Sequence, residues 1–209
     1  MGFEHIDAPN YLRFPLWIQY LTDPKSKDPG QELVDALSHD RFIDKPHFAT
    51  LVASHDHRGN GRGLRAACFH QLQIEGEVLS GGGLLKNTEL LQSAFDNDAN
   101  RFIGSSMFNI ALENSNQKGY CTEKIFRPLR MNTIPIYWGD EMNPEPEVLS
   151  PDCFIPFDPA QPDLMLKEVQ KLKANDSLRK AFLKQPKTTH HARDWVNDKV
   201  EELKKRLQD

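Results

Sequence analysis

The sequence lacks the features of a membrane-spanning or secreted protein. No apolar run approaches the roughly 18 residues of a transmembrane helix, so we expect no transmembrane segment. The first ten residues, MGFEHIDAPN, contain no basic segment and no apolar core, and we expect no signal peptide there. Cysteine is scarce. Cys68, Cys121 and Cys153 are widely spaced, which suits a reducing compartment and makes no metal-binding pattern.

An excess of positive charge is also lacking. The 26 Lys and Arg residues are outnumbered by 30 Asp and Glu residues, which gives a net charge of −4. This balance argues against a general nucleic-acid binder and against a polybasic membrane anchor. No internal repeat or low-complexity tract stands out. A hydrophobic content of 38% over 209 residues is enough to bury the core of one large domain or two small ones.

Residues 108–139 are the stretch around which the chain is organised. Residues 108–112 are apolar and β-prone, residues 115–119 form a polar loop, and a second apolar strand follows at residues 133–138. Thr122 is placed to cap a helix between the two strands. Strands joined by such a helix make a right-handed crossover of a parallel sheet, and ligands in these folds bind at the carboxyl ends of the strands.

A second start of the same kind precedes this stretch. Residues 47–54 predict a strand, residues 55–63 a glycine-rich turn and residues 64–72 a helix. Together the two units predict an α/β fold, a Rossmann-like parallel sheet with helices on both faces. Pro128 falls inside the helix that begins at Thr122, so we expect that helix to be short or kinked.

The rest of the chain divides into a lead-in and further elements. Residues 1–45 read as an irregular lead-in or inter-domain segment, and residues 46–209 as one domain that ends in helices. The expected further elements are a strand at 153–157 and helices at 88–95, 162–173, 177–183 and 192–207.

The loop before the Thr122 helix carries polar groups suited to an anionic ligand. Free N–H groups at a helix N-terminus bind anions, and Lys124 adds a cation in the first turn. Asn114, Ser115, Tyr120 and Glu123 add donors, an aromatic face and an acceptor. Together they could hold a phosphorylated, hydroxyl-rich ligand such as a nucleotide sugar. A capped surface helix with solvated acidic and basic side chains explains the same spacing.

Arg65 is a second candidate cation, in the first turn after the glycine-rich loop. An arginine there could clamp a diphosphate bidentately against helix N–H groups, although a solvated, charge-rich loop is the alternative. His55 and His57 are two residues apart with no partner pair, so we interpret them as surface histidines. Residues 96–98, Asp-Asn-Asp, follow a helical segment and are interpreted as a polar helix end. We therefore expect no metal site.

Residues 112–115 (LENS), 120–124 (YCTEK) and 134–139 (IPIYWG) resemble the donor-binding motif of the α-1,3/4-fucosyltransferases, glycosyltransferase family 10, especially its bacterial branch. The resemblance implies the C-terminal, donor-binding half of a two-domain GT-B glycosyltransferase. In that family an arginine after a serine contacts the donor, and Arg65 matches it with Ser54 as a neighbour. The glycines at 81–83 also recur in the family before a helix.

The resemblance implies a GDP-fucose donor and a glycan acceptor that contains N-acetylglucosamine, with inverting transfer of the α-1,3 type. It implies no tightly bound cofactor, no required metal, and a bacterial-type cytoplasmic location, free or peripheral at the inner face of a membrane. The donor-binding residues that we expect are Ser54, Arg65, Asn114, Ser115, Tyr120, Thr122, Glu123 and Lys124.

One part of the family pattern is missing. The general base of the family lies in the N-terminal domain, shortly before a Gly-Phe-Asp/Glu segment, which here is Gly2-Phe3-Glu4. No catalytic residue is therefore identified in this chain, and we expect the base upstream of Met1. Three interpretations stay open: a compact enzyme or its catalytic portion, a GDP-sugar-binding module that acts with an N-terminal acceptor domain or partner chain, and a donor domain for another nucleotide sugar.

Overall fold

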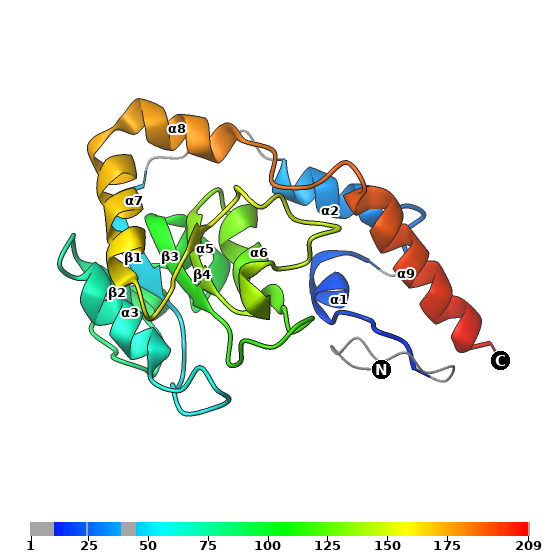
Figure 1. Cartoon of the computed structure of the whole chain (residues 1–209), viewed down its shortest axis with the longest axis horizontal. Helices are drawn as coiled ribbons and strands as arrows, with labels where there is room; N and C mark the ends of the chain where they lie inside the picture. Colours follow the sequence, from blue (N-terminus) through cyan, green and yellow to red (C-terminus); the bar gives the residue numbers. More distant parts are fainter. Residues whose placement is uncertain (1–10, 24, 39–44, 209) are drawn as a thin grey trace.

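The computed structural model describes residues 11–23, 25–38 and 45–208. Its centre is a five-stranded parallel sheet with the strand order β2-β1-β3-β4-β5 (Figure 1). The strands are β1 (His47–Leu51), β2 (Val78–Ser80), β3 (Ser106–Leu112), β4 (Ile134–Trp138) and β5 (Ile155–Pro156). The chain runs outward from β1 to β2 and then returns to place β3 on the other side of β1, so the order reverses between β1 and β3.

The central strands are apolar along most of their length because helices cover both faces of the sheet. The register places Ala49 of β1 beside Phe108 of β3, and Phe108 beside Ile134 of β4. All five residues of β4 are buried. This confirms the parallel α/β sheet that the sequence predicts, with helices on both faces.

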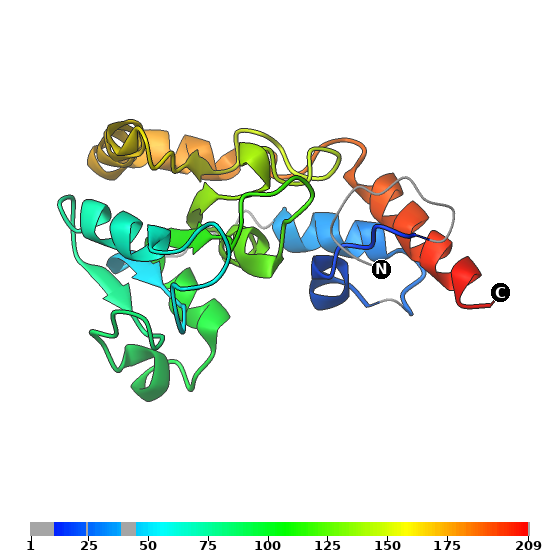
Figure 2. The ribbon, with the colours of Figure 1, turned by 60° about the horizontal axis from the view of Figure 1, so that its bottom comes forward.

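One face of the sheet is covered by α3 (Leu64–Leu72), α7 (Pro162–Ala174) and the end of α8 (Asp176–Lys184). The other face is covered by α6 (Glu123–Arg130), and α5 (Ala99–Gly104) packs against α6, β1 and β3. Figure 2 shows α7 and α8 above the sheet, with α5 and the short α4 (Leu90–Ser93) below it. Each residue of the long strands therefore faces helices on one side of the sheet or the other.

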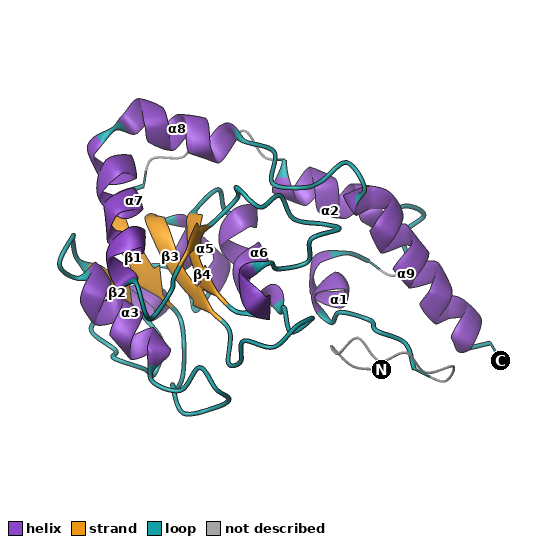
Figure 3. Ribbon diagram, viewed as in Figure 1, coloured by secondary structure: helices purple, strands orange, loops and turns teal. Residues whose placement is uncertain are grey.

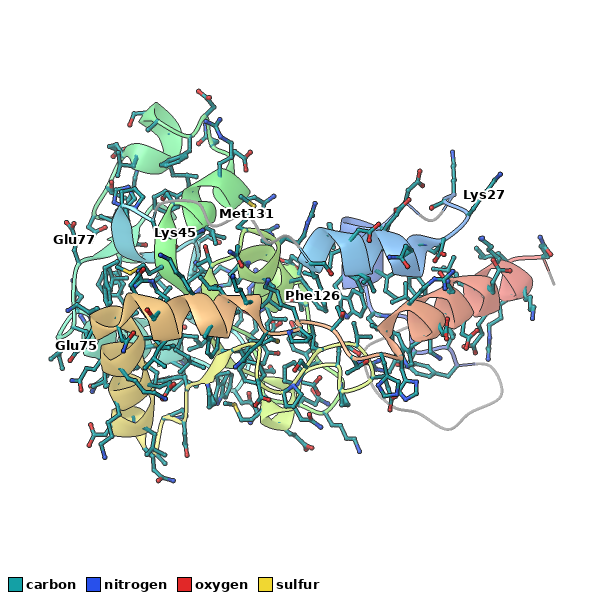
Figure 4. The ribbon with its side chains drawn as sticks, turned by 90° about the horizontal axis from the view of Figure 1, so that it is seen from above. Lys27, Lys45, Glu75, Glu77, Phe126 and Met131 are labelled. Atoms are coloured by element: carbon teal, nitrogen blue, oxygen red, sulfur yellow. The ribbon has the colours of Figure 1, made fainter. Side chains whose placement is uncertain are left out.

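Lys45 fastens two of these helices to the sheet. Its Nζ donates hydrogen bonds to the carbonyl oxygens of Gly104, at 2.6 Å, and Met131, at 2.8 Å (Figure 4). A third bond runs to Thr133 Oγ1, at 3.1 Å, just before β4. A cation suits this position because the carbonyls at helix C-termini have no partner within the helix. Burial lowers the Lys45 pKa to about 8.

Three helices lie together beyond α6, away from the strands: α1 (Trp17–Leu21), α2 (Pro29–Leu37) and α9 (Ala192–Arg206) (Figure 3). The Trp17 ring stacks on Phe126 of α6, with ring centroids 4.4 Å apart. Asp28 caps α2 through Gln31 N and also accepts from Arg193 of α9. The beginning and the end of the described chain thus pack on one another.

The helices predicted at residues 64–72, 162–173, 177–183 and 192–207 are confirmed to within one residue at each end. The strand predicted at residues 47–54 ends earlier, at Leu51, and the last strand is only Ile155–Pro156. The structure also contains β2 and α5, which the sequence did not predict, and helices α1 and α2 within the lead-in. The division at residue 45 stays a prediction, and Gly2-Phe3-Glu4 lies outside the described residues.

Candidate functional site

A cavity of about 390 Å³ opens at the carboxyl ends of β1 and β3, where the strand order reverses. This is the position at which doubly wound sheets bind ligands. Its lining comes from β1 and the residues that follow it, β3, α5, α6, the first turn of α3 and the glycines after β2. The polar side chains in the lining are those of Ser54, His55, Arg65, Asn109, Asn114, Lys124 and Arg127.

Arg65 reaches the cavity from the first turn of α3, and its side chain is held by oxygen atoms from two strand ends. Gly63, in the left-handed region at φ 81°, precedes that helix. Arg65 Nε and Nη2 donate to Leu112 O, at 3.2 and 2.8 Å, and Nη1 donates to His55 O, at 3.2 Å. Nη2 also donates to Asn114 Oδ1, at 2.7 Å. The guanidinium is therefore fixed in one orientation with 5% of the residue exposed.

Lys124 stands in the first turn of α6 beside a buried carboxylate. Its Nζ lies 2.9 Å from Glu113 Oε2 and 2.9 Å from Thr122 Oγ1. Glu113 also accepts from Thr122 N, at 2.7 Å, and from the Thr122 hydroxyl. Burial raises the pKa of Glu113, and the nearby Lys124 cation opposes that rise. The ammonium is thus aimed by the carboxylate while the Lys124 side chain stays 29% exposed towards the cavity.

The structure contradicts the predicted capping hydrogen bond of the Thr122 side chain. Thr122 occupies the N-cap position of α6, but its side chain makes no capping hydrogen bond. The hydroxyl donates to Glu113 instead, the residue that directly follows β3. The N–H groups of the first turn of α6 are therefore not covered by this side chain.

The loop between Asn114 and Thr122 is braced from outside the cavity. Gly119 N donates to Asp140 Oδ1, at 2.5 Å, and Gly119 O accepts from Arg13 Nη2, at 3.1 Å. Arg13 in turn forms a buried ion pair with Glu145, at 2.8 Å. A second cavity of about 400 Å³ lies among Arg13, Lys118, Asp140 and their neighbours. The loop is thereby tied to the lead-in segment and to the turn after β4.

Two glycines near the cavity, Gly82 and Gly59, lie against the backbone of a neighbouring segment. A Cβ on Gly82 would lie 2.3 Å from Ala53 O, and a Cβ on Gly59 would lie 2.1 Å from Asn114 O. Neither position has room for a side chain. The triple glycine at 81–83 therefore lets the turn after β2 pack against the end of β1.

Four of the predicted donor-binding residues line the cavity: Ser54, Arg65, Asn114 and Lys124. The structure does not bring the other four to its wall. Thr122 lies behind Lys124, and Glu123 faces Arg127, at 3.8 Å. The remaining two, Ser115 and Tyr120, belong to the loop that borders the site.

Four residues of the site were missed by sequence reasoning. Asn109 was read only as part of an apolar strand. Glu113 was read only as part of a motif, although its place directly after an apolar strand is a signal for a buried partner of Lys124. Arg127, one turn after Glu123, was not considered. His55 was interpreted as a surface histidine, whereas it is half-buried and lines the cavity, and burial lowers its pKa.

The helix predicted at residues 88–95 is shorter, Leu90–Ser93, and the segment 96–98 leads into α5, which Asp98 caps by accepting from Asn100 N and Arg101 N. Within the described ranges, no three His, Cys, Asp or Glu side chains are grouped so as to hold a metal ion. Among the described helices, none has the length and apolarity needed to cross a membrane.

The switch-point cavity of this parallel α/β domain gathers two cations at the starts of two helices, which is the arrangement that holds phosphorylated ligands in folds of this class. The C-terminal model of glycosyltransferase family 10 (fucosyltransferase) matches residues 43–205 of the chain. The protein therefore belongs to glycosyltransferase family 10, as the motifs at 112–115, 120–124 and 134–139 indicate.

Similar proteins carry the same family name. The α-(1,3)-fucosyltransferase FucT of Helicobacter pylori is 36% identical over 166 residues, which cover 66% of this chain and 33% of that protein. A putative fucosyltransferase of Acanthamoeba polyphaga mimivirus is 33% identical over 111 residues, covering 53% of this chain and 18% of that protein. The chain thus spans about a third or less of the length of these relatives.

The fold is also shared with solved structures. A crystal structure of α1,3-fucosyltransferase with GDP-fucose matches all of this chain and 69% of its own, with a TM-score of 0.67 and 23% identity. A crystal structure with GDP matches with a TM-score of 0.68 and 23% identity over 68% of its chain. These matches confirm the predicted fold, and the family model places the chain in the C-terminal part of the family's sequence.

Proposed function

We propose that this chain binds GDP-fucose in the cavity at the switch point and supplies the donor half of an inverting fucosyltransferase. The reaction would transfer L-fucose to a glycan that contains N-acetylglucosamine, with α-1,3 linkage. The observation that carries the proposal is the convergence of Arg65 and Lys124, from two different helices, on one cavity. Family membership and the GDP-fucose and GDP bound in the similar crystal structures support the choice of donor.

In the proposed reaction, an acceptor hydroxyl attacks the anomeric carbon of fucose. The bond from that carbon to the diphosphate oxygen breaks, and GDP leaves with the electron pair. Negative charge grows on the diphosphate, so preorganised cations lower the barrier most if they face that charge. Arg65 and Lys124 are the groups for this role, because carbonyl oxygens fix one and Glu113 aims the other.

The remaining proposed donor contacts lie around this centre. Asn114 accepts from Arg65 through Oδ1, so its amide nitrogen can still donate to a ligand. Ser54 lines the cavity at the end of β1. Ser115, Tyr120 and Glu123 are proposed to meet hydroxyl groups of the ribose or the sugar, with Thr122 holding Lys124 in place. No bound cofactor or metal is part of the proposal.

The proton of the acceptor hydroxyl needs a general base. The described residues place no carboxylate in the wall of the cavity. The second candidate function is therefore a partner-dependent half, which binds the GDP-sugar and turns over only with an N-terminal acceptor domain or partner chain. The same observation favours an acceptor site that is completed by that domain. We propose that the whole protein is located in the cytoplasm or at the inner face of a membrane.

The test is a calorimetric titration of the purified chain with GDP, and with UDP as the competing nucleotide. Lys124→Ala and Arg65→Lys are compared with Lys86→Ala, which removes an exposed cation paired with Glu89 and outside the cavity. Arg65→Lys keeps the charge but loses the fork that contacts Leu112 and His55. GDP binding that is lost in both site variants and kept in Lys86→Ala supports the donor site.

Three other results would each mean something different. Normal GDP binding by Lys124→Ala would refute the role of that cation. Tighter binding of UDP than of GDP would point to another nucleotide sugar. GDP-fucose binding without transfer, followed by transfer when the N-terminal domain of a family 10 enzyme is added, would favour the partner-dependent half over the compact enzyme.

A further inference from the structure

The cavity has a charged mouth and a more apolar inner end. Arg65, Asn114 and Lys124 stand near the carboxyl edge of the sheet, where β3 ends. Further back along β3, the wall is formed by Asn109 and Ala111, whose side chains lie on the α6 face of the sheet, together with Ile103 of α5. The diphosphate of a bound nucleotide sugar would meet the charged mouth, and one end of that nucleotide sugar would extend inward.

Arg127 belongs to that inner end. It lies three residues after Lys124 on α6, which is about 4.5 Å along a helix that runs back against the direction of the strands. Its side chain lines the cavity on the same side of α6 as Lys124. Arg127 therefore lies about one helical turn further from the carboxyl edge of the sheet than Lys124, and its side chain is the more exposed of the two, at 40% against 29%.

The guanidinium of Arg127 keeps its donors available. In the part of the chain that the structure describes, its ion-pair partner is Glu123, at 3.8 Å, which is longer than a hydrogen bond. The side chain is 40% exposed, whereas Arg65 is buried and bonded to three residues. Arg127 can thus turn its planar fork to a ligand without first breaking internal hydrogen bonds.

The inner end suits a nucleobase better than a sugar. The anomeric carbon must stay where an acceptor hydroxyl can reach it, so the fucose has to face the open mouth. The base at the opposite end of the ligand then lies against Ile103, Ala111 and Asn109, a mostly apolar wall that fits a planar ring. Guanine presents two adjacent acceptors, O6 and N7, which match the arginine fork.

We propose that Arg127 reads the base of the donor, donating two hydrogen bonds to O6 and N7 of guanine, and so makes the cavity selective for a guanine nucleotide. This inference rests on the proposed function, because it takes the diphosphate to lie between Arg65 and Lys124. Uracil offers no equivalent pair of acceptors on one edge, so UDP gains nothing from this arginine.

The experiment is calorimetry on the whole chain with GDP, 7-deaza-GDP and UDP. Arg127→Lys keeps the charge and removes the fork. Arg130→Lys is the matched control, since Arg130 is an exposed arginine on the same helix and outside the cavity wall. We expect Arg127→Lys to weaken GDP binding about tenfold and to change UDP binding less than about twofold, while Arg130→Lys changes neither.

The 7-deaza ligand isolates the contact, because it lacks only the N7 acceptor. The unaltered protein should bind it several times more weakly than GDP, and Arg127→Lys should bind the two alike. An equal loss of GDP and UDP affinity in Arg127→Lys, or an unchanged ratio of the two, overturns the inference and leaves the donor site intact. Failure of the unaltered protein to bind any nucleoside diphosphate overturns the proposed function instead.

Discussion

Replacing Arg13 with methionine should destabilise the protein far more than removing one partner of an equally well-formed ion pair on the surface. The Arg13 and Glu145 side chains are 9% and 2% exposed, and two hydrogen bonds join them, at 2.8 and 3.2 Å. Removing one partner of a buried pair leaves the other charge without compensation, which costs about 3–5 kcal/mol. Glu145 keeps a hydrogen bond from Trp17 Nε1, at 2.9 Å, so the lower end of that range, about 3 kcal/mol, is expected.

The assay is urea unfolding followed by tryptophan fluorescence, with the free energy of unfolding compared between variants. Arg193→Met is the control, because Arg193 and Asp28 are also closely paired, at 2.6 Å, but are 53% and 32% exposed. Its effect should be close to the error of the measurement. The double variant Arg13→Met with Glu145→Gln should recover part of the loss, since no buried charge then remains.

The pH dependence provides an independent check. Burial raises the pKa of Glu145, and the Arg13 cation opposes that rise, so losing Arg13 raises the pKa further. A folded protein whose carboxyl pKa is raised binds a proton that the unfolded chain releases, and its stability falls as the pH increases through that interval. The deficit of Arg13→Met should therefore be smaller at pH 5 than at pH 8. A deficit equal to that of Arg193→Met, or one independent of pH, would refute the reasoning.

Three further outcomes are expected. Because burial lowers the Lys45 pKa from 10.5 to about 8, the folded protein loses this proton before the unfolded chain does, and its stability relative to Lys45→Met should rise between pH 8 and 10 in urea titrations. Gly82→Ala should lower the unfolding free energy by about 1–3 kcal/mol in the same assay, as its Cβ would meet backbone atoms of Ala53; an unchanged midpoint would contradict the close approach. All three cysteines are buried, and burial raises the Cys153 pKa to about 12, so a thiol reagent should react slowly with the native protein and fully in urea.

The sequence predicted the parts of the fold that local pattern controls. The helix at 64–72 follows from a preceding glycine-rich turn, and the helix at 192–207 follows from an apolar stripe of regular spacing. Strand β2 was missed because three residues are too few to establish a period. Helix α5 was missed for a related reason: it has only six residues, and its main signal is the Asp98 cap, which was read as part of a polar helix end.

The site was predictable in its residue types and less so in its connections. Arg65 and Lys124 follow turn signals that are local in the sequence. The atoms that orient Arg65 belong to Leu112 and Asn114, about 50 residues away, and only the parallel pairing of β1 with β3 brings them together. The Thr122 hydroxyl donates to Glu113, nine residues earlier in the chain, and makes no capping bond to its own helix. The donor-binding roles themselves stay predictions for the titrations above.

The packing of α2 on α9 has a consequence for biosynthesis. Asp28 and Arg193, whose side chains join the two helices, are separated by 165 residues of chain. On a ribosome, the strands and their crossover helices emerge before α9 exists, while the apolar side chains of Leu33 and Leu37 wait without that partner. The face that α2 presents to α9 can therefore close only after α9 has been synthesised.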